Sequence, residues 1–314
     1  MNHVRTSHEA VLDLGVVPSS TLPERDADII NFPAYENGAP KSLQHMLTVQ
    51  WHRMALKNLE TDRALPPSDR ARILSASALY SSMWLDALPV DNDRRLTLSD
   101  AEMSWAVRML LGLELPHAVR CPCAVYTRDP LHFQTCPKNK RTVLTHRHDH
   151  VLRTLAGLAR EAGLACMLEP LTRETRAEHG LRPDGLLITP QGDNLWFDVT
   201  ICTPSSATAL AAGSASHRGR EAHRASLRKH SKYRAHVQTH GGTFAGCAME
   251  AHGALHSDVL RVLRVFADAA VSQGWSQQRF LTRALFRVAI ALQQGNAWTF
   301  LRLVGRDASA PGSA

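Results

Sequence analysis

Residues 182–202 read RPDGLLITPQGDNLWFDVTIC, and they hold two short apolar runs on either side of a turn-forming segment. The runs are Gly185–Ile188 and Leu195–Cys202. Both favour strands, and Thr189–Asn194 between them contains the Pro, Gly, Asp and Asn that are typical of a hairpin turn. The stretch therefore predicts two antiparallel strands, with Asp184 opening the first and Asp198 inside the second.

The segments on either side of this hairpin extend it into a small sheet flanked by helices. Their apolar residues follow helical spacing in some stretches and form short strand-like runs in others. The expected elements are, in chain order, a helix over Asp149–Gly163, a strand over Leu164–Glu169, a basic helix over Ala215–Val237, a strand over Thr243–Met249, and closing helices over about Ser257–Ser272 and Ser276–Gln294. The order helix, three strands, helix, strand predicts an α/β fold around a small central sheet.

Each of the first three predicted strands carries one carboxylate at or near an end. Because strand side chains alternate, Asp198 and Thr200 share one face of their strand, opposite Phe197. A buried Asp is costly unless its charge is compensated, which favours a metal ligand or an ion pair at Asp198. Mg²⁺ prefers oxygen ligands and keeps several waters, so two or three acids suffice to bind it. The predicted catalytic acids and ligands of Mg²⁺ or Mn²⁺ are Asp184, Asp198 and Glu169.

Two lysines on the basic helix are candidates for assisting the attack of water. Lys229 and Lys232 are three residues apart on one helical face, and Glu221 lies almost on the same line. A positioned lysine can orient or deprotonate water and offset the charge that grows on a phosphate. The alternative is a solvated basic face, or one that only grips phosphates, formed by Arg220, Arg224, Arg228, Lys229, Lys232 and Arg234.

A cluster of cysteine and histidine precedes these segments. Cys121-Pro122-Cys123, His132 and Cys136 supply three thiols and one imidazole. Such ligands, at about 2.0–2.3 Å in a tetrahedron, suit zinc. The set therefore predicts a structural zinc site. One alternative is buried thiols with a surface histidine, and another takes the fourth ligand from a nearby histidine: His146, His148 or His150.

Composition indicates a folded and basic protein. The 314 residues are 44% hydrophobic and 21% charged, and the formal net charge is +7 at pH 7. This charge favours a polyanionic partner, with a basic surface kept for solubility as the alternative. No stretch approaches 18 consecutive apolar residues, and no apolar signal core follows the N-terminus, so we expect a nuclear or cytoplasmic protein with no membrane partner. In such a reducing compartment, Cys166, Cys202 and Cys247 are expected to be buried thiols.

These features divide the chain into five segments. They are a disordered N-terminal segment (1–40), a helical linker region (41–118), the zinc knuckle (119–147), a catalytic α/β domain (148–300) and a loose C-terminal tail (301–314). Within the linker region, helices are expected over Lys41–Leu59, from a cap at Ser68 to Tyr80, and from a capping motif at Ser99 to Gly112.

In order and spacing, these motifs resemble those of the restriction-like endonuclease domain at the C-terminal end of non-LTR retrotransposon polyproteins, a branch of the PD-(D/E)XK nuclease superfamily. The likeness covers roughly residues 75–300. It is carried by Cys121, Cys123, His132 and Cys136 as a Cys-Cys-His-Cys knuckle, Arg147-His148-Asp149 as the Arg-His motif, Pro183-Asp184, Asp198-Val199-Thr200-Ile201, Lys229 to Tyr233 as Lys-x-x-Lys-Tyr, and Trp84–Pro89 with Leu111–Leu113 as the preceding linker.

This resemblance implies an αβββαβ core and metal-dependent nicking of target DNA, with Asp184 and Asp198 as metal ligands. The superfamily's usual lysine two residues after the second acid is Thr200 here, so its role passes to Lys232 or Lys229. No reverse-transcriptase signature such as Tyr-x-Asp-Asp is present, which indicates a retroelement fragment or a domesticated or decaying copy. The residues expected to contact DNA, or the RNA of a retroelement, are Arg147, His148, Arg182, Arg228 and Tyr233.

The sequence as a whole thus predicts a zinc-knuckle-bearing, Mg²⁺-dependent DNA endonuclease. Two other functions stay open. One is a catalytically inactive zinc-knuckle module that only binds nucleic acid, and the other is a metal-dependent enzyme acting on small phosphate esters. The net positive charge and the knuckle favour a nucleic-acid substrate over the small ester.

Overall fold

The computed structural model describes residues 35–36, 39–40, 43–87, 94–139, 144–170 and 182–307. The chain divides into two units, Met1–Leu65 and Pro66–Ala314. The boundary therefore lies inside the predicted linker region 41–118, and the knuckle belongs to the same unit as the α/β domain.

The described residues of the first unit form one long helix and a short strand pair. Strand β1 (Tyr35–Glu36) pairs antiparallel with β2 (Ala39–Pro40), and α3 (Leu43–Thr61) follows. The helix was predicted, but the strand pair was not, because it lies in the segment predicted to be disordered. The other residues of 1–40 lie outside the described residues.

The second unit is built on a four-stranded mixed sheet with the order β5-β6-β7-β8. Its elements are α8 (Thr145–Glu161), β5 (Cys166–Leu168), β6 (Gly185–Ile188), β7 (Asn194–Cys202), α11 (Arg220–His240) and β8 (Thr243–Glu250). β5 pairs antiparallel with β6, and β6 pairs antiparallel with β7, whereas β7 and β8 are parallel. The predicted order helix, three strands, helix, strand is confirmed, and the fold is mixed α/β.

The predicted hairpin forms between β6 and β7. Leu186 lies opposite Trp196, and the Thr189 amide donates to the Asp193 carbonyl at 2.9 Å across the turn. The basic helix starts later than predicted because Gly219, with φ of 63°, breaks the helical path just before Arg220. This hairpin sets the position of both predicted catalytic aspartates.

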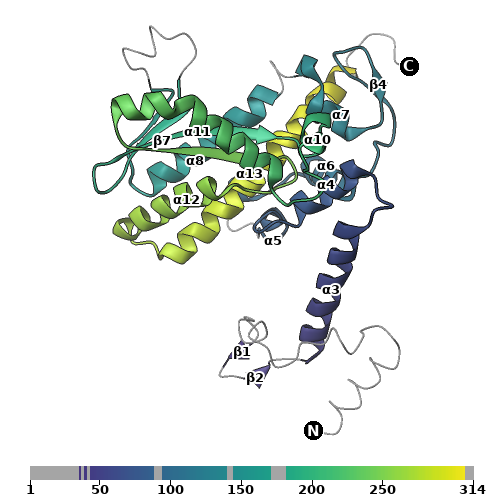
Figure 1. Cartoon of the computed structure of the whole chain (residues 1–314), viewed down its shortest axis with the longest axis horizontal. Coiled ribbons are helices and arrows are strands. Elements are labelled where there is room, and N and C mark those ends of the chain that lie inside the picture. Colours follow the sequence, from purple (N-terminus) through teal and green to yellow (C-terminus); the bar gives the residue numbers. More distant parts are fainter. Residues whose placement is uncertain are drawn as a thin grey trace. The chain divides into compact units, whose positions relative to one another are not determined.

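The two faces of the sheet pack against different helices (Figure 1). Phe197 and Val199 enter a core shared with α8, α12 (Ser257–Ala270) and α13 (Gln277–Asp307). On the other face, Trp196 packs with Tyr233 of α11. The predicted alternation along β7 is therefore confirmed, and Asp198 lies on the face that α11 covers.

A helical region precedes the knuckle in the same unit. It contains α4 (Pro67–Ala76), α5 (Met83–Asp86), a 3₁₀ turn at Arg94–Leu96 and α6 (Asp100–Leu111). The capping motif at Ser99 is confirmed: its hydroxyl accepts from the Glu102 amide, and the Glu102 carboxylate accepts from the Ser99 amide at 2.7 Å. The predicted cap at Ser68 is wrong, because Pro66 is the N-cap and a proline at the first helical position needs no hydrogen-bond partner for its nitrogen.

The knuckle consists of a small hairpin and two short helical segments. They are β3 (Val119–Arg120), β4 (Tyr126–Thr127), α7 (Pro130–Thr135) and a 3₁₀ turn at Pro137–Asn139. A separate core holds this part against α13, where Phe300 stacks on Trp105 with ring centroids 4.3 Å apart. The predicted tail 301–314 is therefore wrong for 301–307, which continue α13, while 308–314 lie outside the described residues.

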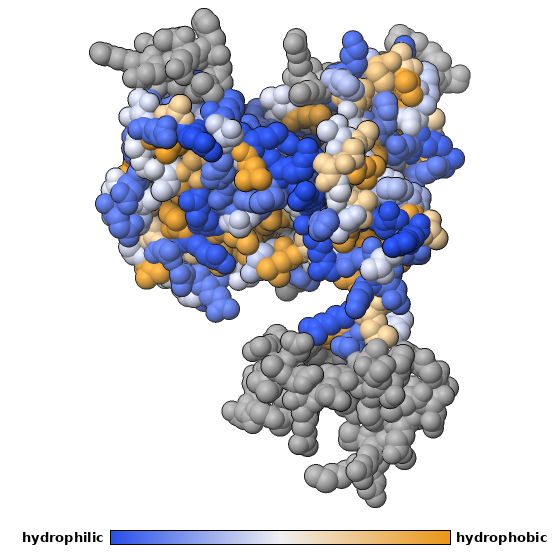
Figure 2. All heavy atoms as spheres, viewed as in Figure 1, coloured by the Kyte–Doolittle hydropathy of each residue, from blue (hydrophilic) through white to orange (hydrophobic). Residues whose placement is uncertain are grey.

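The outer surface is mostly hydrophilic in the view of Figure 2, with apolar side chains scattered between polar ones. Within the described part of the chain, none of the helices combines the length and apolar character needed to cross a membrane.

Candidate metal centres

Asp184 and Asp198 are neighbours across the β6–β7 pair. Gly185 pairs with Phe197, so the residue that precedes β6 lies beside Asp198 on β7. The Asp184 carboxylate reaches that strand, where Oδ2 accepts from the Val199 amide at 2.7 Å. Burial, followed by the charge of Asp184, raises the pKa of Asp198. The two acids are therefore electrostatic neighbours.

Asp198 is held by two groups of α11. The residue is 2% exposed, its Oδ1 lies 2.5 Å from Lys229 Nζ, and its Oδ2 accepts from the Tyr233 hydroxyl at 2.7 Å. Lys232 contacts the Tyr233 hydroxyl instead, at 3.1 Å. Of the two predicted lysines, the structure thus brings Lys229 into contact with Asp198, whereas Lys232 reaches Asp198 only through the Tyr233 hydroxyl.

His148 links α8 to Asp184. Its Nε2 lies 2.9 Å from Asp184 Oδ2, and its Nδ1 lies 3.1 Å from Asp149 Oδ1. Burial lowers the pKa of His148, but the hydrogen bonds and charges of Asp184 and Asp149 outweigh this and raise the pKa to about 9. The ring is therefore protonated at neutral pH and donates from both nitrogens. Both ring nitrogens of His148 thus contact acids of the protein and are not available to DNA, so the predicted DNA contact through them is wrong.

Glu169 does not join the two aspartates. Its carboxylate pairs with Arg182 at 2.6 Å, and both side chains are exposed. Among the described residues, it forms no group with Asp184 and Asp198 in which the ligand atoms lie within 4.8 Å of one another. The prediction of Glu169 as a third metal ligand is therefore wrong. The chain leaves β5 at this residue with a left-handed φ of 48°, which the strand pattern did not reveal.

Arg147 and Tyr233 were predicted to contact DNA, and both are buried. Arg147 is 3% exposed, and its Nη1 donates to the side chains of Gln134 and Asn296. Tyr233 is 1% exposed, with its hydroxyl between Asp198 and the Arg182 carbonyl. Burial lowers the pKa of Arg147 to about 10, and burial together with the charge of Asp198 raises the pKa of Tyr233. Both predictions are wrong because these side chains point into the fold.

Sequence spacing could have revealed the burial of Arg147. It lies four residues before Val151 and eight before Leu155, on the apolar stripe of α8 that packs into the core. Burying an arginine on such a stripe costs free energy unless its guanidinium group has hydrogen-bond partners. The partners Gln134 and Asn296 come from α7 and α13, and no pattern within α8 points to them.

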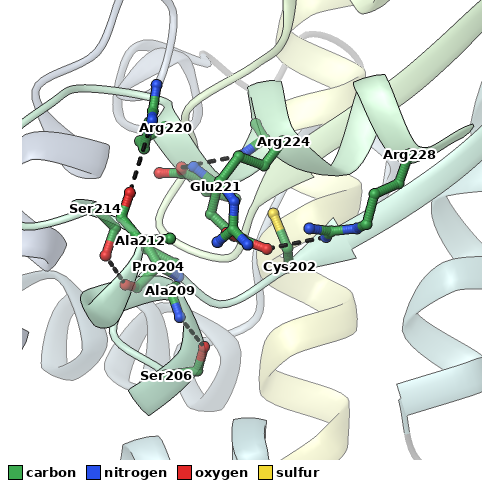
Figure 3. A network of polar contacts seen from close by, with 12 residues as sticks. Cys202, Pro204, Ser206, Ala209, Ala212, Ser214, Arg220, Glu221, Arg224 and Arg228 are labelled. Atoms are coloured by element: carbon green, nitrogen blue, oxygen red, sulfur yellow. Dashed lines mark hydrogen bonds and ion pairs between the residues drawn. The ribbon is translucent and has the colours of Figure 1, made fainter. Parts of the chain in front are cut away.

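The start of α11 carries a network of arginines around one acid (Figure 3). Glu221 Oε2 lies 2.7 Å from Arg224 Nη1, and its Oε1 lies 3.0 Å from Arg228 Nη2. Arg220 instead donates to the Ala212 carbonyl at 3.3 Å. Glu221, which the sequence placed in line with the lysines, thus holds arginines. The side chain of Arg228 is 56% exposed, so this predicted DNA contact stays accessible, as does Arg182.

The knuckle brings Cys121, Cys123, His132 and Cys136 together. The ligand atoms of all four lie within 4.8 Å of one another, and Cys123 Sγ is 3.3 Å from His132 Nε2. Ligands about 2.0–2.3 Å from a tetrahedral zinc are separated by roughly 3.5–3.8 Å. The three thiols and one imidazole can therefore bind a metal such as zinc.

The alternative histidine ligands have other partners. His146 stacks on Trp298 with ring centroids 3.5 Å apart, and His150 Nε2 lies 2.9 Å from Gln294 Oε1. His148 contacts Asp184, so His132 is the histidine that lies with the three thiols and could complete a metal site. The remaining cysteines are free thiols: Cys247 is buried, whereas Cys166 and Cys202 are partly exposed.

Asn139 supports the knuckle and was missed from the sequence. It is fully buried, and its Nδ2 donates to Cys121 Sγ at 3.7 Å and to the Phe133 carbonyl at 3.2 Å. Burial raises the pKa of the Cys121 thiol to about 12, whereas a hydrogen bond from the Val125 backbone is the main cause that lowers the pKa of Cys123 to about 7. An amide donor on a buried sulfur stabilises the thiolate that a metal requires.

No protein-family model matches this sequence, and a search of curated proteins finds no significant match. The function is therefore inferred from the chemistry of these two clusters.

Proposed function

We propose that this chain is a divalent-metal-dependent endonuclease that hydrolyses DNA phosphodiester bonds, with an αβββαβ core of the PD-(D/E)XK type and a structural zinc knuckle. The observation that carries the proposal is the arrangement around Asp198. A buried carboxylate lies beside a second carboxylate, Asp184, and 2.5 Å from the ammonium of Lys229. Two acids and an amine in one place are the groups that metal-assisted phosphodiester hydrolysis needs.

The two acids fit a hard cation such as Mg²⁺ or Mn²⁺. Each offers carboxylate oxygens, the ligands that these ions prefer. All contacts of Asp184 within the described residues use Oδ2, so Oδ1 is the oxygen that a cation would take. The raised pKa of Asp198 reflects its own burial first and then the nearby charge of Asp184, and a cation would offset both. When bound, the ion would supply Lewis acidity and a water molecule of lowered pKa.

Residues of the chain have separate roles in this proposal. Lys229 pairs with Asp198 when no cation is bound, and with the cation bound it would offset the charge that develops on the phosphate, in place of the lysine that Thr200 replaces. Tyr233 holds Asp198 Oδ2. The accessible guanidinium groups of Arg182 and Arg228 bind the DNA backbone, and Cys121, Cys123, His132 and Cys136 hold zinc.

A second candidate is a zinc-knuckle module that binds nucleic acid without cutting it. One observation favours it: both oxygens of Asp198 already have partners, Lys229 and Tyr233, so the acid is satisfied without a cation. Activity requires Lys229 to give up this ion pair when the metal binds. The two candidates therefore differ in what the chain does with Mg²⁺ or Mn²⁺ present.

The test is a nicking assay on supercoiled plasmid with Mg²⁺, Mn²⁺ or a chelator. Asp198→Asn preserves shape and removes the charge, and we expect it to abolish nicking while DNA retention in a gel-shift assay stays nearly unchanged. The matched control is Asp193→Asn, in the exposed turn between β6 and β7, which should nick like the unmodified chain. Binding of DNA without nicking by the unmodified, zinc-loaded chain would favour the binding module.

A further inference from the structure

A chain of contacts runs from the surface of α8 to the proposed metal ligand Asp184. Asp149 Oδ1 lies 3.1 Å from His148 Nδ1, and His148 Nε2 lies 2.9 Å from Asp184 Oδ2. The Asp184 side chain is 19% exposed and that of His148 is 29% exposed, so water screens the attraction between these two groups only partly. The order carboxylate, imidazole, carboxylate fixes the orientation of the ring between two acceptors.

The second donor to Asp184 comes from another element. The Val199 amide of β7 donates to the same oxygen, Oδ2, at 2.7 Å. One carboxylate oxygen therefore accepts from α8 and from β7 together, which prevents rotation of the group about its last bond. Among the described residues, the other oxygen, Oδ1, makes no hydrogen bond or ion pair, so its lone pairs can serve a ligand.

We propose that His148, held by Asp149, is a positioning residue that makes Asp184 a one-oxygen ligand and so favours Mg²⁺ and Mn²⁺ over Ca²⁺ at the site. This inference rests on the proposed nuclease function. Mg²⁺ demands octahedral geometry at about 2.0–2.1 Å, whereas Ca²⁺ accepts bidentate carboxylates at about 2.3–2.6 Å. A carboxylate with one oxygen withdrawn cannot bind in the bidentate way. A purely structural role for His148, tying α8 to the sheet, would leave the choice of cation unchanged.

The experiment measures cation binding, not activity. Mn²⁺ affinity of the full, zinc-loaded chain is obtained by titration with detection of free Mn²⁺, and Ca²⁺ affinity by competition. His148→Leu removes the donor, His148→Gln restores one near the position of Nε2, and Asp149→Asn keeps an acceptor for Nδ1 but weakens the hold on the ring. Asp198→Asn identifies the site. His150→Gln, on the same helix with its ring nitrogen on Gln294, is the matched control.

For His148→Leu we expect Mn²⁺ affinity to fall about 10–100-fold, the usual loss for a partner of a metal ligand. The preference for Mn²⁺ over Ca²⁺ should narrow at the same time. His148→Gln should recover most of both, Asp149→Asn should show a smaller loss in the same direction, and His150→Gln should match the unmodified chain.

The outcomes separate this inference from the proposed function. If the unmodified chain binds no Mn²⁺ beyond what Asp198→Asn binds, the proposed function fails and this inference fails with it. If the unmodified chain binds Mn²⁺ at this site and His148→Leu shows the same affinity and the same preference, only the role of His148 is overturned. Should His148→Leu fail to fold, Asp149→Asn decides: an affinity within twofold of the unmodified chain contradicts the inference.

Discussion

The knuckle and the acid site are two candidate metal centres that are built in opposite ways. The four knuckle ligands come from one short stretch, Cys121–Cys136, and a turn and a helix of six residues bring them together. The acid site draws Asp184, Asp198 and Lys229 from three segments, and its contacts depend on the register of β6 and β7 and on the rotation of α11. Spacing along the chain thus reveals a local ligand set directly, whereas in a long-range site it reveals the candidates but not their partners.

The prediction with the largest expected effect concerns whether the four Cys and His residues of the knuckle bind a metal. Cys136→Ser should lose bound zinc and melt the knuckle, because zinc binding in such small sites is worth on the order of 10 kcal/mol and is coupled to folding. Zinc content per chain, measured with a colorimetric chelator, and thermal unfolding followed by circular dichroism give the result. Cys166→Ser changes a partly exposed thiol outside the cluster and should keep its zinc. Equal zinc content in both variants would contradict the prediction that the knuckle binds zinc.

The second prediction compares Arg147 and Arg228, two arginines that were both predicted to contact DNA. Arg147→Met leaves Gln134 and Asn296 without a buried donor, so we expect the free energy of unfolding in urea to fall by about 3 kcal/mol. Arg228→Met removes an exposed side chain that pairs with Glu221 and should cost under about 1 kcal/mol. Arg228→Met should also weaken DNA retention. If Arg147→Met instead lost DNA retention without losing stability, Arg147 would contact DNA despite its burial.

Period and turn chemistry were enough to predict most of the fold. Alternation along β7 put Asp198 and Phe197 on opposite faces, the Thr189–Asn194 turn implied the hairpin, and the capping pair Ser99 with Glu102 marked the start of α6. These features depend on residues close in sequence, where side-chain direction follows from the element alone. The clustering of Cys121, Cys123, His132 and Cys136 was predictable for the same reason.

The partners of the acids were not predictable in this way. Choosing Lys229 over Lys232 requires the rotation of α11 relative to β7, and the helix period places both on a similar face. Glu169 was assigned by analogy with the other strand ends, but the left-handed turn at this residue carries it to Arg182. Each error concerns where a long side chain ends, which is set by packing between elements far apart in sequence.

A third effect tests whether a buried partner of the acid site matters to its chemistry. Tyr233→Phe removes the hydroxyl that donates to Asp198 and leaves the Arg182 carbonyl without this contact. We expect nicking to fall about 10–100-fold and the free energy of unfolding to fall by about 2 kcal/mol, because the lost hydrogen bond serves a buried carboxylate. Tyr126→Phe, at an exposed position of the knuckle, is the control and should change neither. Full activity of Tyr233→Phe would mean that Lys229 alone orients Asp198.

The smallest expected effect lies in the knuckle turn. Ala124 adopts a left-handed φ of 72° between β3 and β4, a conformation that costs a residue with a Cβ roughly 1–2 kcal/mol and that glycine adopts freely. The extra freedom of glycine in the unfolded chain offsets part of this gain. We therefore expect Ala124→Gly to raise zinc affinity by about three- to fivefold in a competition titration against a chelator.

The matched substitution Ala235→Gly lies on the exposed face of α11, where glycine should destabilise the helix by about 1 kcal/mol and leave zinc affinity unchanged. The same chemical change then has opposite signs in the two regions, because one backbone position is left-handed and the other helical. A drop in zinc affinity for Ala124→Gly would show that the turn is shaped by contacts of the alanine methyl group. In that case even the local centre would depend on packing that its spacing does not reveal.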